Sequence, residues 1–229
     1  RPGEMAGTVT VQCPPGWTAE SSSYRIQKED STAHGTITVH PAKDSKPGEY
    51  ALRFKTEYAV QEATVRVFDV AVASGLTIGI VASYDNTLES AAKELNIPHT
   101  LLDSTALKAG SLAKYKTIVV DIRAYLVRED LKSHHDRLLE YVKDGGNLLV
   151  MYQRTQEWKP EYAPYPFQIS DKRVTEEEAP IDILQPQHPL LTHPNKIDDE
   201  DWTGWKQERA LYFPKNVPQE YTLLLASHD

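Results

Sequence analysis

The segment Leu76–Ala82, with the sequence LTIGIVA, is a near-continuous run of apolar residues. Such a run is typical of a β-strand that is buried on both faces of a sheet. Asn86 and Glu89 follow it three positions apart, which is the spacing of a capping box at the start of a helix. The sequence therefore predicts a strand followed by a helix, as in a domain with a parallel sheet.

Strand and helix patterns continue to alternate after this first pair. We expect a helix at residues 129–143, which ends at Gly145 and Gly146. We expect further strands at residues 97–102, 117–122, 147–152 and 221–226. Repeated strand-helix units with right-handed crossovers form a parallel sheet with helices on both faces. Residues 74–229 are therefore predicted to form an α/β domain with a doubly wound, flavodoxin-like parallel sheet.

The ends of the predicted strands supply the candidate binding residues. Ligands of open α/β sheets bind beyond the carboxyl ends of the strands, where the strand order reverses. In a flavodoxin-like order this point lies between the first and third strands, which are followed by Ser83–Asp85 and Arg123–Tyr125. We predict a ligand-binding crevice lined by Tyr84, Asp85, Asn86, Arg123, Tyr125 and Gln153. The alternative is that Asp85 and Arg123 pair with each other and close it.

Residues 1–73 show the two-residue period of β-strands. Turn sequences such as Pro14-Pro15-Gly16 separate alternating runs at residues 8–11, 24–27, 36–39, 50–54 and 63–70. We predict an all-β, immunoglobulin-like sandwich, truncated before Arg1 because a complete one has about seven strands in about 100 residues. The pattern Pro-Pro-Gly-Trp17, followed by Pro-Gly-Glu-Tyr50, resembles small sandwich modules appended to bacterial carbohydrate-active enzymes.

A long segment rich in Pro, Tyr and Trp, residues 153–220, separates the last two predicted strands. A structureless insertion of this length is unusual in a compact domain unless it is functional or packs through its own side chains. We predict that its run Trp205–Phe213 is a structural clamp, in which Trp205, Glu208 and Arg209 fasten the insertion to a sheet. The alternative is that this run is a recognition surface.

The composition excludes several classes of function. A net charge of -8 argues against nucleic acid or an anionic membrane surface as a partner. No apolar run approaches the roughly 20 residues of a membrane span. The single Cys13 excludes an internal disulfide and a thiolate-rich metal site, and we expect it to be a small buried residue beside a strand.

Five pieces of sequence carry a family resemblance: Tyr84–Thr87, Asp121–Tyr125, Leu139–Gly146, Pro164–Phe167 and Trp205–Phe213. From about Gly79 onward the chain resembles the class I glutamine amidotransferase-like domain that lies downstream of the catalytic domain in bacterial LmbE-like, or PIG-L, deacetylases. The resemblance implies a non-catalytic accessory or binding region of an exported, periplasmic or extracellular, enzyme that acts on N-acetylated sugars. Its implied partners are its own upstream catalytic domain and carbohydrate.

The zinc of such deacetylases is bound by Ala-His-Pro-Asp-Asp and His-x-x-His sequences of the upstream domain, which this chain lacks. The resemblance therefore implies no cofactor in this fragment. Amidotransferases of this fold carry a nucleophilic Cys after a central strand. Here Tyr152-Gln153-Arg154 stands at that position, so we predict no catalytic residue. The competing hypothesis is a stand-alone hydrolase or metal-dependent enzyme built around Asp85 and Arg123.

Two clusters contain residue types that can bind a metal. His134-His135-Asp136 is the more metal-like, but a helix places His135 near the apolar stripe, which favours a buried imidazole. The run Asp198–Asp201 lacks the spacing and the Gly of an EF-hand loop, which favours a solvated acidic loop. The sequence therefore predicts no metal ligand.

Overall fold

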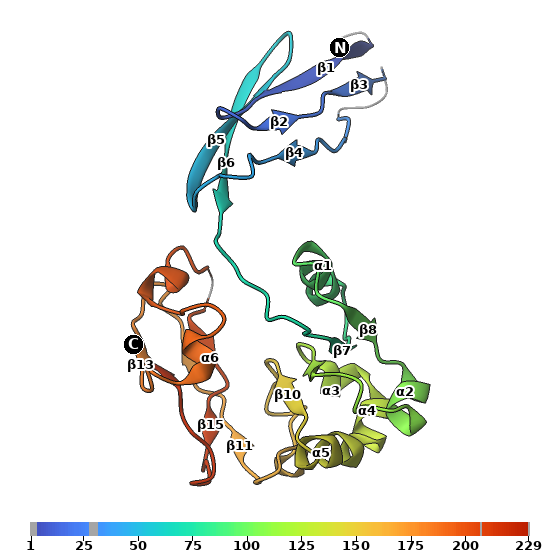
Figure 1. Cartoon of the computed structure of the whole chain (residues 1–229), viewed down its shortest axis with the longest axis vertical. Helices are drawn as coiled ribbons and strands as arrows, with labels where there is room; N and C mark the ends of the chain where they lie inside the picture. Colours follow the sequence, from blue (N-terminus) through green and yellow to red (C-terminus); the bar gives the residue numbers. More distant parts are fainter. Residues whose placement is uncertain (1–3, 28–31, 207, 229) are drawn as a thin grey trace. The chain divides into compact units, whose positions relative to one another are not determined.

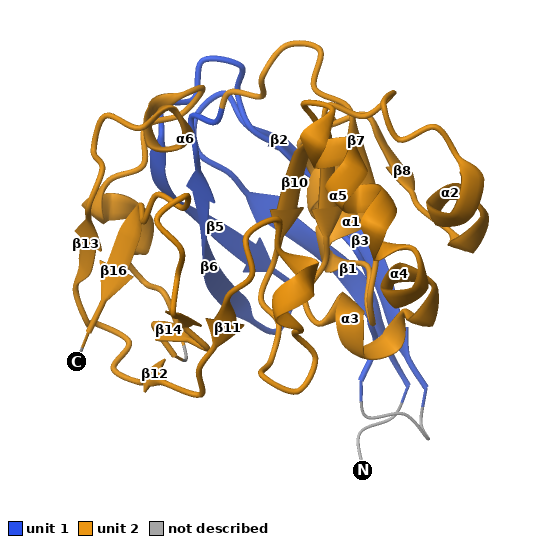
Figure 2. Ribbon diagram, turned by 90° about the horizontal axis from the view of Figure 1, so that it is seen from below, with its two compact units in different colours: residues 1–70 blue, residues 71–229 orange. Residues whose placement is uncertain are grey.

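The computed structural model describes residues 4–27, 32–206 and 208–228 (Figure 1). The chain divides into two compact units, Arg1–Val70 and Ala71–Asp229, which are coloured separately in Figure 2. The described residues of the first unit form antiparallel strand pairs, whereas the second unit contains a parallel sheet, helices and short antiparallel pairs. The architecture is therefore mixed α/β.

The first unit is a four-stranded antiparallel sheet accompanied by a two-stranded ribbon. The sheet has the order β3-β1-β5-β6, with bounds Ser22–Ile26, Met5–Gln12, Gly48–Lys55 and Val60–Val67. The ribbon pairs β2, Thr18–Ala19, with β4, Val39–His40. Side chains along β1 alternate between half-buried and exposed, as expected for a strand with one face toward a core.

Trp17 lies in the core of the first unit. Its side chain is buried, and its ring centroid lies 4.8 Å from that of Tyr50 on β5. The chain reaches Trp17 through a turn in which Gly16 has a φ of 80°, a conformation that favours glycine, and the Trp17 N–H donates to the Pro14 carbonyl. The Pro-Pro-Gly-Trp sequence thus places an aromatic ring against the sheet.

The second unit is built on a four-stranded parallel sheet of order β10-β9-β7-β8. The bounds of β7, β8, β9 and β10 are Ile78–Val81, His99–Leu101, Thr117–Val120 and Asn147–Val150. The first strand, β7, lies between β8 and β9, so the order reverses direction between β7 and β9. All four residues of β7 are buried, which agrees with its apolar sequence.

Helices cover both faces of this sheet. They are α1, α2, α3, α4 and α5, with bounds Thr87–Glu94, Ser104–Ala109, Ala124–Val127, Glu129–Ser133 and His135–Lys143. Ile78 and Ile80 pack with Ala92 of α1, whereas Val81 packs with Leu138 of α5 in a separate and larger cluster. Alternate residues of one strand thus enter two cores, as the pleat of a strand requires.

Two local predictions about the helices are wrong. The helix expected at residues 129–143 is broken into α4 and α5 at His134. Asn86 occupies the N-cap of α1, but the side chain that bonds the first turn is Asp85, whose Oδ1 accepts from the Thr87 N–H at 2.9 Å. Glu89 pairs instead with Lys93 one turn along the helix.

The predicted fifth strand of the parallel sheet is also wrong. Strand β16, Leu225–Ser227, pairs antiparallel with β13, Ile181–Ile183. Two more short antiparallel pairs join β11, Gln168–Ile169, to β15, Pro214–Lys215, and β12, Arg173–Val174, to β14, Ala210–Leu211. The segment 153–220 is therefore not an insertion between two strands of one sheet, because the chain after β10 pairs with itself (Figure 1).

Single turns of helix complete this C-terminal part, at η1, α6 and η2, with bounds Pro160–Tyr162, Pro189–Thr192 and Asp199–Trp202. Its strands are two or three residues long. Strands this short contain one side-chain alternation at most, so the sequence shows no β period here.

Candidate functional site

Asp121 joins the ends of the two central strands of the parallel sheet. It follows β9 directly and is 5% exposed. Its Oδ2 accepts from the Ser83 N–H at 3.1 Å and from the Ser83 hydroxyl at 2.9 Å, and its Oδ1 accepts from the Ile122 N–H. The carboxylate thus fixes the chain after β7 to the chain after β9, at the point where the strand order reverses.

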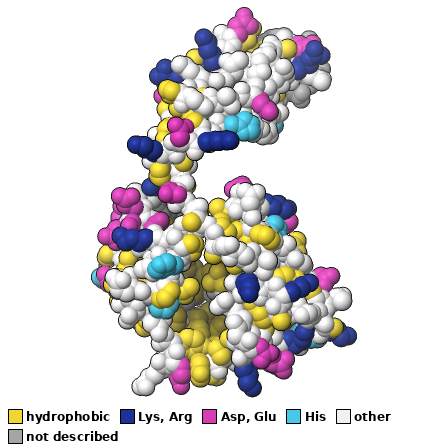
Figure 3. All heavy atoms as spheres, viewed as in Figure 1, with side chains coloured by type: hydrophobic (Ala, Val, Ile, Leu, Met, Phe, Trp, Pro, Cys, Tyr) yellow, Lys and Arg dark blue, Asp and Glu magenta, His cyan; other side chains and the backbone are white. Residues whose placement is uncertain are grey.

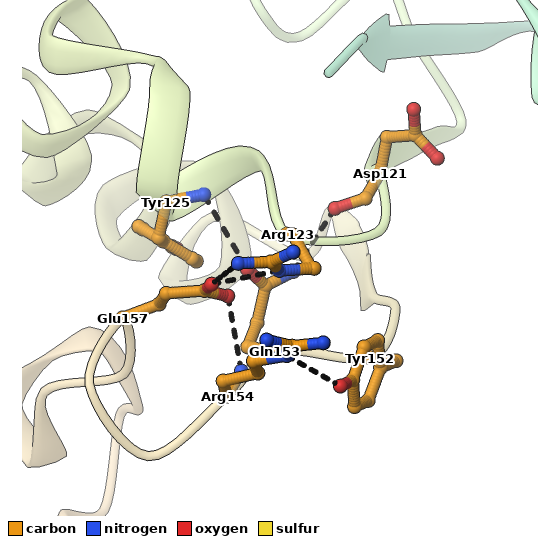
Figure 4. Close-up of polar contacts among 7 residues, drawn as sticks. All are labelled: Asp121, Arg123, Tyr125, Tyr152, Gln153, Arg154 and Glu157. Atoms are coloured by element: carbon orange, nitrogen blue, oxygen red, sulfur yellow. Dashed lines mark hydrogen bonds and ion pairs between the residues drawn. The ribbon is translucent and has the colours of Figure 1, made fainter. Parts of the chain in front are cut away.

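Gln153 braces the same edge from the chain after β10. Its Nε2 donates to the Asp121 carbonyl at 2.9 Å and to the Met151 carbonyl at 3.1 Å, and its Oε1 accepts from the Tyr125 N–H (Figure 4). The residue is 5% exposed. Gln153 is therefore a buried amide that holds this edge together, and it also lines the cavity described below.

Arg123 forms an ion pair with Glu157. Its Nε and Nη2 donate to Glu157 Oε1 at 2.8 Å and 2.6 Å, and Glu157 Oε2 accepts from the Arg154 N–H (Figure 4). The Glu157 side chain is 2% exposed and that of Arg123 is 25% exposed. The hydrogen bonds that Arg123 donates to Glu157 raise the pKa of Arg123 above its ordinary value. Arg123 therefore pairs with Glu157 and not with Asp85.

The other predicted crevice residues separate into exposed and buried groups. Tyr84 is 56% exposed, and Arg123 Cζ lies 5.7 Å from its ring centroid. Asp85 and Asn86 are exposed at the start of α1, and the hydrogen bond from the Thr87 N–H lowers the pKa of Asp85. Of the six predicted residues, the structure brings together only Tyr84 and Arg123 at the surface of this edge.

Tyr125 belongs to the core, which corrects its predicted place in the crevice. Its side chain is fully buried, and its ring stacks on that of Tyr162 with centroids 4.3 Å apart. Its hydroxyl lies 2.8 Å from His135 Nδ1, and burial raises the pKa of Tyr125. The apolar pattern of the sequence indicates that a strand ends here, but it does not indicate which of the following side chains turn inward.

Sequence reasoning missed three residues that complete this edge. The exposed Arg154 donates from Nε to the Tyr152 hydroxyl at 3.0 Å, a hydrogen bond that raises the pKa of Arg154 (Figure 4). The ring centroid of Tyr152 lies 5.5 Å from that of Tyr212. Tyr152 ends the strand predicted at residues 147–152 and Arg154 lies two residues beyond it, whereas Tyr212 belongs to the run Trp205–Phe213 that was predicted to be a clamp.

An apolar cavity of about 210 Å³ opens beside these rings. Its walls include Tyr152, Trp158, Phe167, Leu211 and Tyr212. Figure 3 shows hydrophobic side chains gathered around a hollow in the second unit. Aromatic walls combine a large apolar area with a polar tip, so they suit a ring-shaped ligand that also carries hydroxyl groups.

His135, the more metal-like candidate, lies in the core of the second unit. It is 3% exposed, and its Nδ1 is bonded to the Tyr125 hydroxyl. In the part of the chain that the structure describes, no group of three or more His, Cys, Asp or Glu side chains is placed to hold a metal ion. The acidic run caps its own turn, because Asp201 accepts from the Asp198 N–H and Asp198 accepts from the Glu200 N–H.

The buried His135 predicts a pH-dependent stability. Burial lowers its pKa in the folded chain below 6.5, and the opposing carboxylates of Asp136 and Glu161 do not overcome this. Below pH 6.5 the unfolded chain gains a proton that the folded chain does not, so the free energy of unfolding is expected to fall on acidification, by at most about 1.4 kcal/mol per pH unit. His135→Asn, which keeps a partner for the Tyr125 hydroxyl, is expected to remove this part of the slope.

Urea denaturation of both proteins at about pH 7.5 and about pH 5.5 measures this difference. Other titrating groups change both proteins equally and cancel in the comparison. Identical pH slopes for the parent and His135→Asn would show that the imidazole does not resist protonation in the fold.

The predicted clamp joins segments of the C-terminal part to one another. Glu208 forms an ion pair with Arg173 of β12. Arg209 donates from Nε to the Ala179 carbonyl at 2.8 Å and from Nη1 to the Trp202 carbonyl at 3.0 Å. Trp205 is 45% exposed, so its side chain is not buried in this clamp. Gln207, within the same run, lies outside the described residues.

One part of the chain matches a known family. Residues 4–59, most of the first unit, match the family model described as NPCBM-associated, NEW3 domain of alpha-galactosidase. No curated protein and no solved structure matches the chain. Among the described residues, every helix is too short or too polar to cross a membrane. The chain thus contains, at residues 4–59, a region similar to a carbohydrate-associated β-sandwich module.

Proposed function

We propose that this chain is a non-catalytic accessory region of a larger, exported deacetylase of the LmbE-like, or PIG-L, family. The first unit supports a carbohydrate-associated role, because residues 4–59 match a domain of alpha-galactosidase. The second unit supports a degenerate amidotransferase-like domain, because its strand order β8-β7-β9-β10 agrees with a flavodoxin-like sheet. The assignment to the deacetylase family rests on the sequence motifs that resemble it.

The observation that carries this proposal is the state of the polar groups after β9 and β10. Asp121, Gln153 and Glu157 are buried, and each is engaged with protein partners. A nucleophile or general base must be within hydrogen-bond reach of a substrate. Side chains that hold the loops together in this way support a scaffold and not a catalytic centre.

The alternative is a hydrolase or metal-dependent enzyme built around Asp85 and Arg123. Such a site needs Asp85 to act on a substrate or metal and Arg123 to stabilise developing charge. Asp85 instead bonds the first turn of α1, and Arg123 is held by Glu157. These contacts favour the accessory role. Under the proposal, zinc belongs to the upstream catalytic domain, and the partners of this region are that domain and carbohydrate.

We predict that the purified chain is catalytically silent. Acyl transfer without an activated nucleophile or a metal loses several orders of magnitude in rate. Assays with glutamine, p-nitrophenyl acetate and N-acetylglucosamine, each with and without Zn²⁺, are expected to give background rates. Cys13→Ser is expected to change none of them, because Cys13 is half-buried beside β1 in the first unit.

Turnover that scales with protein concentration would contradict this prediction. Loss of that turnover in Cys13→Ser would assign a thiol nucleophile, and loss in Asp85→Asn would assign the competing enzyme. The family can be tested separately, because the residues that precede Arg1 in the parent protein are expected to include an Ala-His-Pro-Asp-Asp sequence.

A further inference from the structure

Two bulky residues of the second unit adopt a left-handed backbone conformation. Among the described residues, φ is positive outside glycine at Asn96 and Asn216, which tolerate it, and at Arg123 and Tyr212, with φ of 56° and 57°. A bulky side chain in this region costs on the order of 1–3 kcal/mol, and such strain concentrates at ligand sites. Both residues contact Tyr152. The Arg123 N–H donates to the Tyr152 carbonyl, and the ring of Tyr212 packs against the ring of Tyr152.

Two arginines lie beside Tyr152, and both bind one buried carboxylate, one through its side chain and the other through its backbone. Glu157 is engaged by the guanidinium of Arg123 and by the backbone N–H of Arg154. The guanidinium of Arg154 donates instead to the hydroxyl of Tyr152, and Arg154 is exposed. Among the described residues, the guanidinium of Arg154 forms no ion pair, so it can receive an anion.

Tyr152 is shared by these cations and by the aromatic cavity. Its hydroxyl accepts from Arg154, and its ring forms a wall of the cavity together with Tyr212. The volume of about 210 Å³ lies below the roughly 300–1,000 Å³ of drug-sized pockets, which restricts an occupant to about one small ring. Arg154 does not line the cavity itself, so the anionic substituent of a bound ring would extend past the Tyr152 hydroxyl to reach its guanidinium.

We propose that Tyr152, Tyr212 and Arg154 form a binding site for a small organic anion, a single sugar-sized ring that carries one carboxylate or phosphate group. The planar guanidinium fork matches both anions, and the tyrosine faces supply the apolar contact for the ring. The left-handed backbone at Arg123 and Tyr212 places both residues against Tyr152, which is shared by the cavity and by Arg154. This site needs neither a catalytic residue nor the proposed deacetylase domain. Its test is therefore independent of the tests of the proposed function.

The test is calorimetric titration of the full chain with glucuronate, glucose 6-phosphate, glucose and inorganic phosphate. Both anionic sugars are expected to bind and to compete with each other, and whichever binds more tightly identifies the anion. Glucose and inorganic phosphate are each expected to bind at least about tenfold more weakly, because each lacks one half of the recognised molecule.

Arg154→Gln is expected to weaken binding of the anionic sugars by about tenfold or more. Lys143→Gln is the matched control, because Lys143 is also an exposed cation. It lies at the end of α5, next to the amino-terminal end of β10, whereas the proposed site lies at the carboxyl end of that strand. Tyr212→Gly is expected to abolish binding while the chain remains folded, because glycine accepts the left-handed backbone without strain and this relief offsets part of the loss of the half-buried ring.

Four results would overturn the proposal, and the first three concern the sugars and the two variants. They are the failure of both anionic sugars to bind at about 10 mM, equal affinities for glucose and glucuronate, and equal losses in Arg154→Gln and Lys143→Gln. Inorganic phosphate that binds as tightly as glucose 6-phosphate would also overturn it, since the aromatic walls would then contribute nothing.

Discussion

Glu157→Ala is expected to lower the free energy of unfolding of the second unit by about 3 kcal/mol, near the lower end of the range for breaking a buried ion pair. The Glu157 side chain is 2% exposed and accepts hydrogen bonds from Arg123 and from the Arg154 N–H. Its loss leaves Arg123 without its carboxylate and close to a second guanidinium. Arg123 is 25% exposed, so water offsets part of the cost.

Thermal unfolding measures this effect, which corresponds to a fall in the unfolding midpoint of about 6–12 °C for a chain of this size. Glu62→Ala is the matched control, because Glu62 binds Arg53 at 2.6 Å but both side chains are more than half exposed, at 59% and 57%. An exposed pair contributes at most about 1 kcal/mol. Similar losses in the two variants would show that burial of the Arg123–Glu157 pair has no energetic consequence.

The parallel sheet was predictable from sequence because burial on both faces leaves a mark in composition. The strands β7 and β9 coincide with the apolar runs at residues 76–82 and 117–122. Residues 221–226 are also apolar, but β16 pairs with β13 and not with β10. An apolar run indicates a buried strand without naming its partner, because pairing depends on where the intervening chain returns.

The candidate site was predicted only in its location. Strand ends can be read from the sequence, so Arg123 and Tyr84 were placed at the correct edge. The direction of a side chain depends on its backbone dihedrals, and the short helix α3 turns Tyr125 inward while the left-handed Arg123 remains at the surface. The partner Glu157 lies 34 residues from Arg123, beyond any local pattern.

Tyr125→Ala is expected to cost about 3–5 kcal/mol of unfolding free energy, the largest loss predicted for this chain. The ring stacks on Tyr162, meets Trp158 edge to face at 6.0 Å between centroids, and is fully buried. Tyr162 and Trp158 belong to the chain after β10, whereas Tyr125 follows β9. The ring therefore packs the C-terminal part against the core of the parallel sheet.

Two further variants, compared by urea denaturation, separate the terms of this loss. Tyr125→Phe removes only the hydroxyl that bonds His135 and is expected to cost about 1 kcal/mol, as for one hydrogen bond. Tyr84→Ala removes a ring that is 56% exposed and is expected to change stability by less than about 0.5 kcal/mol. Because the three changes differ mainly in buried area, a loss for Tyr125→Ala no larger than that for Tyr125→Phe would mean that the aromatic stack does not hold the two parts together.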